Sequence, residues 1–188
     1  KEELDSFSYE VPNIIQSDVP IGKDESENIV IRENGHPKAF DFQPKSHDDL
    51  AIDLKLIDFD RATKITGSRF AMFTGIGARL ERALSDLMIN VHTSSHGYTE
   101  LSPPVIVNSN SMRGTGQLPK FEDDLYKVSD EYWLSPTAEV QLTNFHYDEI
   151  LDGSELPKKY CAFTQCFRKE AGSYGKDMKG IIRLHQFN

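Results

Sequence analysis

The last part of the sequence combines the residue types that a nucleotide site needs. The stretch Phe167-Arg168-Lys169-Glu170 precedes a loop, and residues 182–188 then read as a second strand. The loop is marked by glycines and lysines: Gly172, Gly175, Lys176, Lys179 and Gly180. A guanidinium suits phosphate oxygens and an aromatic ring suits a base. Residues 160–188 therefore predict a closing hairpin that binds a nucleotide, with Arg168 at one base and Phe187 at the other.

Each of these residues also has a purely structural interpretation. Arg168 could be an arginine at a strand end that pairs with a neighbouring acid, and Phe187 could be an ordinary core aromatic. Glu170 could accept a hydrogen bond from a nucleotide or simply pair with Lys169. His185 stands in no arrangement with Asp or Ser that suggests general-base catalysis, so packing is the simpler interpretation.

The composition sets the broad class of the protein. The chain has 188 residues, of which 38% are hydrophobic and 27% charged, and this suits one soluble domain with a sizeable core. No apolar run reaches the ~18 residues of a membrane span. The net charge of −9 argues against a generic nucleic-acid coat. Cys161 and Cys166 are the only cysteines, and their odd separation on one strand points their side chains to opposite faces. Because they cannot readily bond to each other, a reducing compartment is expected.

The hydrophobic pattern predicts the elements that position the hairpin. Apolar residues recur at helical spacing over residues 73–91, and this helix should end near His96-Gly97. A strand is predicted over residues 98–101. The segments 124–128 and 131–134 predict a hairpin, and residues 135–139 open a further helix with Pro136 in its first turn.

The first third of the chain is rich in turn formers and charge. Short strands are expected at residues 29–31 and 39–42, around the Asn34-Gly35 turn. Leu50, Leu54 and Ile57 form a short helical stripe. Residues 1–64 therefore predict a linker segment, and the whole pattern predicts an α+β fold in which helices flank an antiparallel sheet.

Several of these strings, in this order, resemble the seryl-tRNA synthetases, a family of class II aminoacyl-tRNA synthetases. The region of residues 67–104 resembles motif 1, the dimer-forming element, and residues 161–188 resemble motif 2. Between them, residues 114–121 and Thr137-Ala138-Glu139 are further family stretches. The resemblance implies that residues 65–188 form the N-terminal part of a class II catalytic domain. It lacks the helical arm before Lys1 and motif 3 after Asn188, so the isolated chain is expected to be inactive.

The resemblance also implies a reaction, a set of partners and a compartment. Serine and ATP would form seryl-adenylate, and the seryl group would then pass to tRNA(Ser), in a cytoplasmic homodimer with no membrane partner. Arg168 would be the catalytic residue and would contact both ATP and serine. The further ATP-binding residues would be Lys169, Glu170, Leu184, His185, Gln186 and Phe187. Mg²⁺ is expected with ATP, and no metal ligand can be named in this sequence.

Thr137, Ala138 and Glu139 are, by the same resemblance, the serine-binding signature. A buried carboxylate and a hydroxyl at a helix start could hold the ammonium and hydroxyl of serine. The alternative is that the helix dipole alone stabilises Glu139 in a first helical turn. Two other functions remain open for the chain: a synthetase-like ligase that loads an amino acid onto a carrier protein, and a non-catalytic dimerisation or ligand-binding module.

Overall fold

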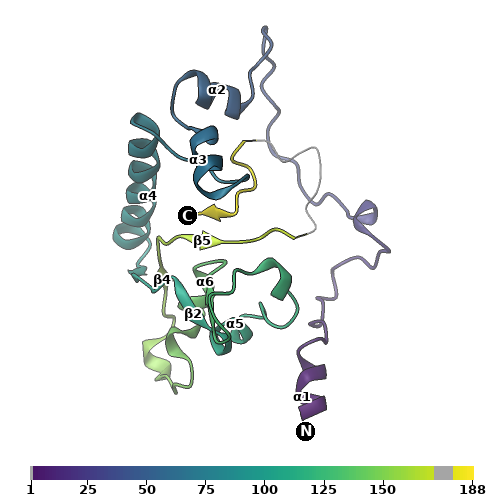
Figure 1. The fold of residues 1–188 in the computed structure, drawn as a ribbon. Coiled ribbons are helices and arrows are strands. Elements are labelled where there is room, and N and C mark those ends of the chain that lie inside the picture. Colours follow the sequence, from purple (N-terminus) through teal and green to yellow (C-terminus); the bar gives the residue numbers. More distant parts are fainter. Residues whose placement is uncertain (1, 172–179) are drawn as a thin grey trace. The chain divides into compact units, whose positions relative to one another are not determined.

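The computed structural model describes residues 2–171 and 180–188 (Figure 1). The chain forms two compact units, Lys1–Lys45 and Ser46–Asn188. Several residues of the predicted nucleotide loop lie outside the described residues: Gly172, Ser173, Gly175, Lys176 and Lys179.

The first unit contains little regular structure. Its helices are α1 (Glu2–Ser8) and the single 3₁₀ turn η1 (Glu25–Glu27). The strands predicted at residues 29–31 and 39–42 are wrong, because both segments are irregular. Ile29, Val30 and Ile31 are 68%, 72% and 95% exposed. A two-stranded hairpin with no buried face gains too little to form alone, and this explains why strand-like residue types are not enough.

The second unit contains the remaining elements. Its helices are α2 (His47–Asp53), α3 (Phe59–Thr66), α4 (Ile76–Ser95), α5 (Ser109–Gly114), η2 (Glu122–Asp124), α6 (Glu139–Thr143), η3 (Asn144–His146) and η4 (Gly153–Glu155). Its strands are β1 (Thr99–Glu100), β2 (Ile106–Asn108), β3 (Tyr132–Leu134), β4 (Tyr160–Cys161), β5 (Cys166–Phe167) and β6 (Gln186–Phe187). The mixture of helices and hairpin-connected strands confirms the predicted α+β class.

The strands pair in three separate two-stranded sheets. β2 pairs with β3 and β5 with β6, both antiparallel, whereas β1 and β4 are parallel with Thr99 opposite Tyr160. The predicted closing hairpin over residues 160–188 is therefore confined to β5 and β6. Its expected first part, β4, pairs with a strand some sixty positions earlier in the sequence, and a local pattern cannot reveal such a partner.

The predicted hairpin around Ser129-Asp130 is present in shortened form. Val128 N–H donates to Tyr132 O at 2.8 Å, and Leu134 N–H donates to Tyr126 O at 2.9 Å. On its other side β3 pairs with β2 through Val107 and Trp133. The segment of residues 124–128 forms only an isolated bridge, between Lys127 and Trp133.

The long helix α4 dominates one side of the second unit (Figure 1). The sequence placed it at residues 73–91, and it runs from Ile76 to Ser95. Its end is as predicted: His96 caps it and Gly97 has φ +70°. At its start Gly77 packs so closely that a Cβ atom there would lie 2.2 Å from Leu56 O. No helix among the described residues is long and apolar enough to cross a bilayer.

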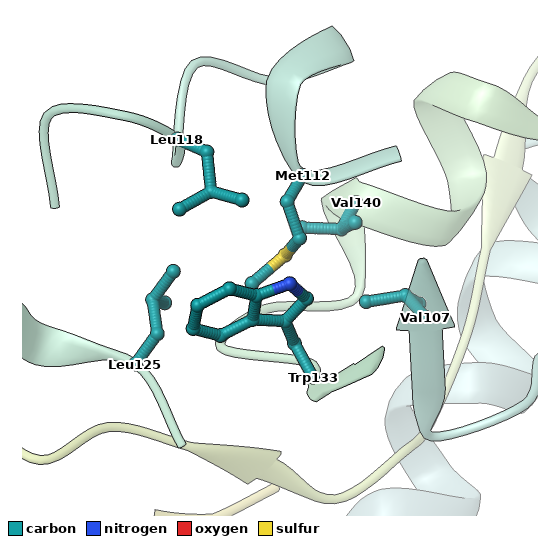
Figure 2. Close-up of a cluster of buried hydrophobic side chains, with 6 residues drawn as sticks. All are labelled: Val107, Met112, Leu118, Leu125, Trp133 and Val140. Carbon is teal, nitrogen blue, oxygen red and sulfur yellow. The ribbon is translucent and has the colours of Figure 1, made fainter. Parts of the chain in front are cut away.

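The core of the second unit lies between β2, β3, α5 and α6. Figure 2 shows its side chains converging from these elements and from two loops, with Trp133 at the centre: Val107, Met112, Leu118, Leu125, Trp133 and Val140. Met112 and Val140 have no exposed surface. The indole Nε1–H of Trp133 donates to Ser109 Oγ at 2.9 Å, so the one polar atom of the ring is satisfied. This core fixes the segment of residues 135–140 against β2 and β3.

Candidate functional site

The β5–β6 hairpin brings the two ends of the predicted nucleotide site together. Cys166 lies opposite Phe187 and Phe167 opposite Gln186. One residue further along, Arg168 N–H donates to His185 O at 2.9 Å. A strand-like ladder therefore holds Arg168 and Phe187 at the same end of the hairpin, as the sequence predicted.

The side chain of Arg168 lies over the ring of Phe187. The guanidinium carbon is 5.0 Å from the ring centroid, and Arg168 Nε donates to Pro136 O at 3.0 Å. A cation over an aromatic face is attracted by the ring quadrupole. Within residues 2–171 and 180–188, Arg168 forms no ion pair with an acid. The alternative that Arg168 pairs with a neighbouring acid therefore has no support in this part of the chain.

The two residues after Arg168 make contacts that the sequence did not predict. Glu170 forms an ion pair with Arg183, on the opposite arm of the hairpin, and not with Lys169. Glu170 also has φ +52°, a left-handed conformation at the turn out of β5. The Lys169 ammonium lies 5.8 Å from the centroid of the Tyr126 ring. The ion pair closes the hairpin just beyond Arg168.

His185 is engaged in packing and in backbone contacts. Its Nδ1–H donates to Arg168 O at 2.9 Å, and its backbone N–H donates to Arg69 O at 2.9 Å. The centroid of its ring lies 5.3 Å from the centroid of the Phe70 ring and 6.3 Å from that of the Tyr126 ring, which it meets edge to face. Burial of Tyr126 raises the pKa of its phenol. His185 thus positions the backbone of Arg168.

Thr137 and Glu139 form a small polar unit next to the hairpin. Thr137 Oγ1 donates to Glu139 Oε2 at 3.1 Å. Glu139 is exposed, so the expectation of a buried carboxylate is wrong. Helix α6 begins at Glu139 and its cap is Ala138, so Pro136 precedes the helix and does not form its first turn.

Ser135 ties this unit to the hairpin. It is fully buried, and its Oγ lies 2.8 Å from Thr137 O and 2.9 Å from Gln141 Oε1. Its carbonyl oxygen accepts a hydrogen bond from Phe167 N–H at 2.9 Å. With the Arg168–Pro136 contact, two hydrogen bonds join residues 135–136 to residues 167–168.

A cavity of about 910 Å³ opens between these segments and α4. Five predicted site residues line it: Ala138, Glu139, Leu184, Gln186 and Phe187. Arg168, Lys169, Glu170, Thr137 and His185 are not among its lining residues. The volume is within the range of small-molecule sites.

Other residues that line the same cavity were not predicted as site residues from the sequence. They come from α4 and from the segment before it, and include Phe70, Phe73, Glu81, Leu84 and Met88. The helical period predicted that Phe73, Leu84 and Met88 share a face and placed Glu81 on the other side, but the partner of that face is set by the tertiary fold. No cluster of three or more His, Cys, Asp or Glu side chains that could hold a metal occurs in the described parts of the chain.

Comparison with known proteins matches the chain to class II aminoacyl-tRNA synthetases. Residues 120–188 match the profile of the tRNA synthetase class II core domain (G, H, P, S and T). A serine–tRNA ligase of Solibacter usitatus is 55% identical over 99% of this chain, and one of Trichlorobacter lovleyi is 56% identical over all of it. The chain spans 44% and 45% of the length of those two relatives.

Two solved structures share the fold. A seryl-tRNA synthetase of Pyrococcus horikoshii complexed with ATP matches 99% of this chain and 46% of its own, at a TM-score of 0.90 and 37% identity. A cytoplasmic serine–tRNA ligase of Naegleria fowleri in complex with AMP also matches 99% of this chain, and 44% of its own, at a TM-score of 0.87 and 30% identity. The chain therefore belongs to the seryl-tRNA synthetase family, within the class II aminoacyl-tRNA synthetases.

Proposed function

We propose that the protein to which this chain belongs activates L-serine with ATP and transfers the seryl group to tRNA(Ser). The observation that carries the proposal is the placement of Arg168 over Phe187, beside the cavity that Glu139 lines. A cation, a flat ring and a carboxylate are the groups that a phosphate, a purine and an ammonium require. The ATP and AMP complexes of the two structural relatives support the nucleotide part of the proposal.

Arg168 would act in the first step. Attack of the serine carboxylate on the α-phosphate joins two anions and places further charge on the phosphoryl oxygens. A guanidinium that contacts both groups offsets their repulsion and stabilises that charge, so the protein contributes positioning and electrostatics. Since the hydrogen bond from Arg168 Nε to Pro136 O holds one edge of the guanidinium, the opposite edge remains available for these contacts.

Phe187 would hold the base. The guanidinium covers one face of its ring, and Leu184 and Gln186, which precede Phe187 in the chain, line the same cavity. The backbone of residues 184–186 could read the edge of the adenine. We further propose that Glu170 and Lys169 contact ATP. For Glu170 this requires the ion pair with Arg183 to be shared with the nucleotide.

Thr137, Ala138 and Glu139 would recognise serine. The Glu139 carboxylate can accept hydrogen bonds from the ammonium, and the hydroxyl of Thr137 is already oriented by its bond to Glu139. Recognition of the substrate hydroxyl by hydrogen bonds would reject an analogue without it by ~10⁴-fold or more, because the unpaired polar groups of the site would be left unsatisfied. Mg²⁺ would accompany ATP, and no step above depends on it.

The decisive experiment is serine-dependent exchange between ATP and pyrophosphate in an enzyme of the full length of the relatives. Arg168→Ala should abolish exchange. Arg113→Ala, which removes an exposed arginine of α5, should leave it unchanged. Near-normal exchange in the Arg168→Ala enzyme would contradict the proposal.

Two other functions remain candidates and can be separated by acceptor. A ligase that loads a carrier protein would also show exchange, but it would transfer the amino acid to the carrier and not to tRNA. A non-catalytic module would show neither exchange nor transfer. Charging assays with tRNA(Ser) and with a carrier protein therefore distinguish all three.

We also propose that the protein is a cytoplasmic homodimer formed through the region of residues 67–104. The long helix α4 exposes a row of large apolar side chains, with Leu80, Leu84, Leu87 and Met88 between 44% and 58% exposed. A row of this kind is typical of a surface that another chain covers. Light scattering of the parent and of a Leu87→Glu variant tests the dimer, which the added charge should dissociate.

A further inference from the structure

The return arm of the closing hairpin, residues 180–187, is held from outside the hairpin by a histidine of α2. His47 Nε2 accepts a hydrogen bond from Ile181 N–H at 3.1 Å. His47 is the first residue of α2 and lies 134 positions before Ile181 in the sequence. It is exposed and is not among the residues that line the cavity. The contact therefore joins the hairpin to a helix that carries none of the site residues.

The contact is close because residue 180 is a glycine. Gly180 has φ +66°, and a Cβ atom there would lie 2.2 Å from His47 Nε2 and 2.9 Å from Asp48 Cβ. Other residues adopt this conformation only at a cost, and any side chain at this position would displace the imidazole from Ile181 N–H. The backbone at Gly180 thus has the shape that the His47 ring requires.

A second contact holds the return arm four residues later. His185 N–H donates to Arg69 O at 2.9 Å, and Arg69 follows α3. Figure 1 shows the arm, in yellow, passing next to α3. The other edge of the arm pairs with β5, through Gln186 and Phe187. The arm is therefore fixed on one side by β5 and on the other by two hydrogen bonds to residues 47–69.

We propose that His47 is a positioning residue for ATP, an inference that rests on the function proposed above. Ile181, Leu184, Gln186 and Phe187 all line the cavity, so the return arm forms one of its walls. Phe187 is the ring assigned to the base. Because His47 fixes the beginning of this wall at Ile181, it sets the position of the groups that receive the adenine, without touching the nucleotide itself.

The hydrogen bond predicts which replacements keep the function. An imidazole nitrogen accepts a hydrogen bond only when it carries no proton, so His47 acts here as an acceptor at Nε2. A glutamine can place its amide oxygen at nearly the same point, whereas an asparagine has the same amide but is one carbon shorter. Since His47 is exposed, neither substitution leaves a cavity in the core.

Equilibrium binding of ATP to the full-length enzyme tests the role. Loss of one neutral hydrogen bond should weaken ATP binding about three- to tenfold in His47→Ala and in His47→Asn, while His47→Gln should stay within about twofold of the parent. In the exchange assay the KM for ATP should rise by the same factor and the KM for serine should not change. An asparagine variant that binds ATP as well as the glutamine variant would overturn the proposal.

Hydrogen exchange measures the contact itself and does not depend on catalysis. The Ile181 amide should exchange about three- to tenfold faster in His47→Ala and His47→Asn than in the parent, because its acceptor is lost. The His185 amide, which Arg69 O accepts, is the internal control and should keep its protection. Equal exchange of Ile181 in the parent and in His47→Ala would contradict the proposal.

The role of His47 and the proposed function can fail separately. An enzyme that binds ATP but shows no serine-dependent exchange contradicts the proposed function alone. Equal ATP affinity in the parent and in His47→Ala overturns the role of His47 alone. A parent enzyme that does not bind ATP would overturn both.

Discussion

Arg168 and His185 are joined by two hydrogen bonds that run in opposite directions. The backbone N–H of Arg168 donates to His185 O, and the imidazole Nδ1–H of His185 donates back to Arg168 O, both at 2.9 Å. Because a carbonyl oxygen can only accept, the second bond places a proton on Nδ1. His185 therefore fixes the backbone from which the arginine side chain projects.

Replacing His185 tests this relationship. His185→Phe keeps the ring that packs on Phe70 and Tyr126 but removes the bond to Arg168 O, and His185→Ala removes both. A neutral hydrogen bond contributes about 0.5–1.5 kcal/mol, so in the full-length enzyme we expect kcat/KM for ATP to fall by up to about tenfold in the Phe variant. The Ala variant should lose more. Unchanged kinetics in His185→Phe would remove the positioning role.

Glu139 and Thr137 can be tested through the choice of amino acid. Glu139→Gln removes the charge that would pair with an ammonium, and we expect the KM for serine to rise by a factor of ten or more while the KM for ATP stays near its parent value. Thr137→Val should relax discrimination against alanine. Exchange kinetics with serine and alanine measure both effects. A Glu139→Gln enzyme with an unaltered serine requirement would refute the assignment.

The core around Trp133 predicts where the chain is vulnerable to truncation of a side chain. Leu125 is 1% exposed and packs in the cluster of Figure 2, so Leu125→Ala should lower the free energy of unfolding by about 2–5 kcal/mol. Ile65 is 66% exposed on α3, and Ile65→Ala should stay within about 0.5 kcal/mol of the parent. Urea denaturation of the two variants gives the comparison. Equal losses would mean that the cluster is not the core.

Cys166 predicts how stability responds to alkaline pH. Burial raises the pKa of its thiol above the ordinary value of 9.0. Above that value the unfolded chain releases the proton and the folded chain keeps it. The unfolded state then binds fewer protons, and stability falls as pH rises. We expect urea midpoints of the parent to decline above about pH 9, and Cys166→Ala to reduce that decline. Parallel pH curves for parent and variant would contradict this.

The sequence predicted the elements whose signal is local. Helix α4 was placed within a few residues, and its end was found because a glycine such as Gly97 adopts positive φ at less cost than other residues. The pairing of Arg168 with Phe187 followed from two strand-like runs that flank one loop. In each case the information lies within a short stretch of chain.

The parts that could not be predicted depend on distant partners. Residues 29–31 are apolar and β-branched, as in a strand, but they pair with no strand in the described part of the first unit. Strand β4 pairs in parallel with the distant β1. Glu139 was expected to be buried because serine binding would require it, yet the structure leaves it exposed. The contribution of α4 to the cavity could not be predicted either, because a helical period shows that an apolar face exists but not which residues pack against it.

Ser135 has a consequence for the geometry of binding. Its carbonyl oxygen accepts a hydrogen bond from Phe167 N–H, and its hydroxyl donates to Thr137 O. One residue therefore connects the end of β5, next to Arg168, with the segment that leads into α6 and Glu139. Two molecules bound at these places would meet at a spacing already set when the chain folded. A reaction between two bound molecules requires a defined relative orientation, and the hydrogen bonds of the buried Ser135 help to fix it.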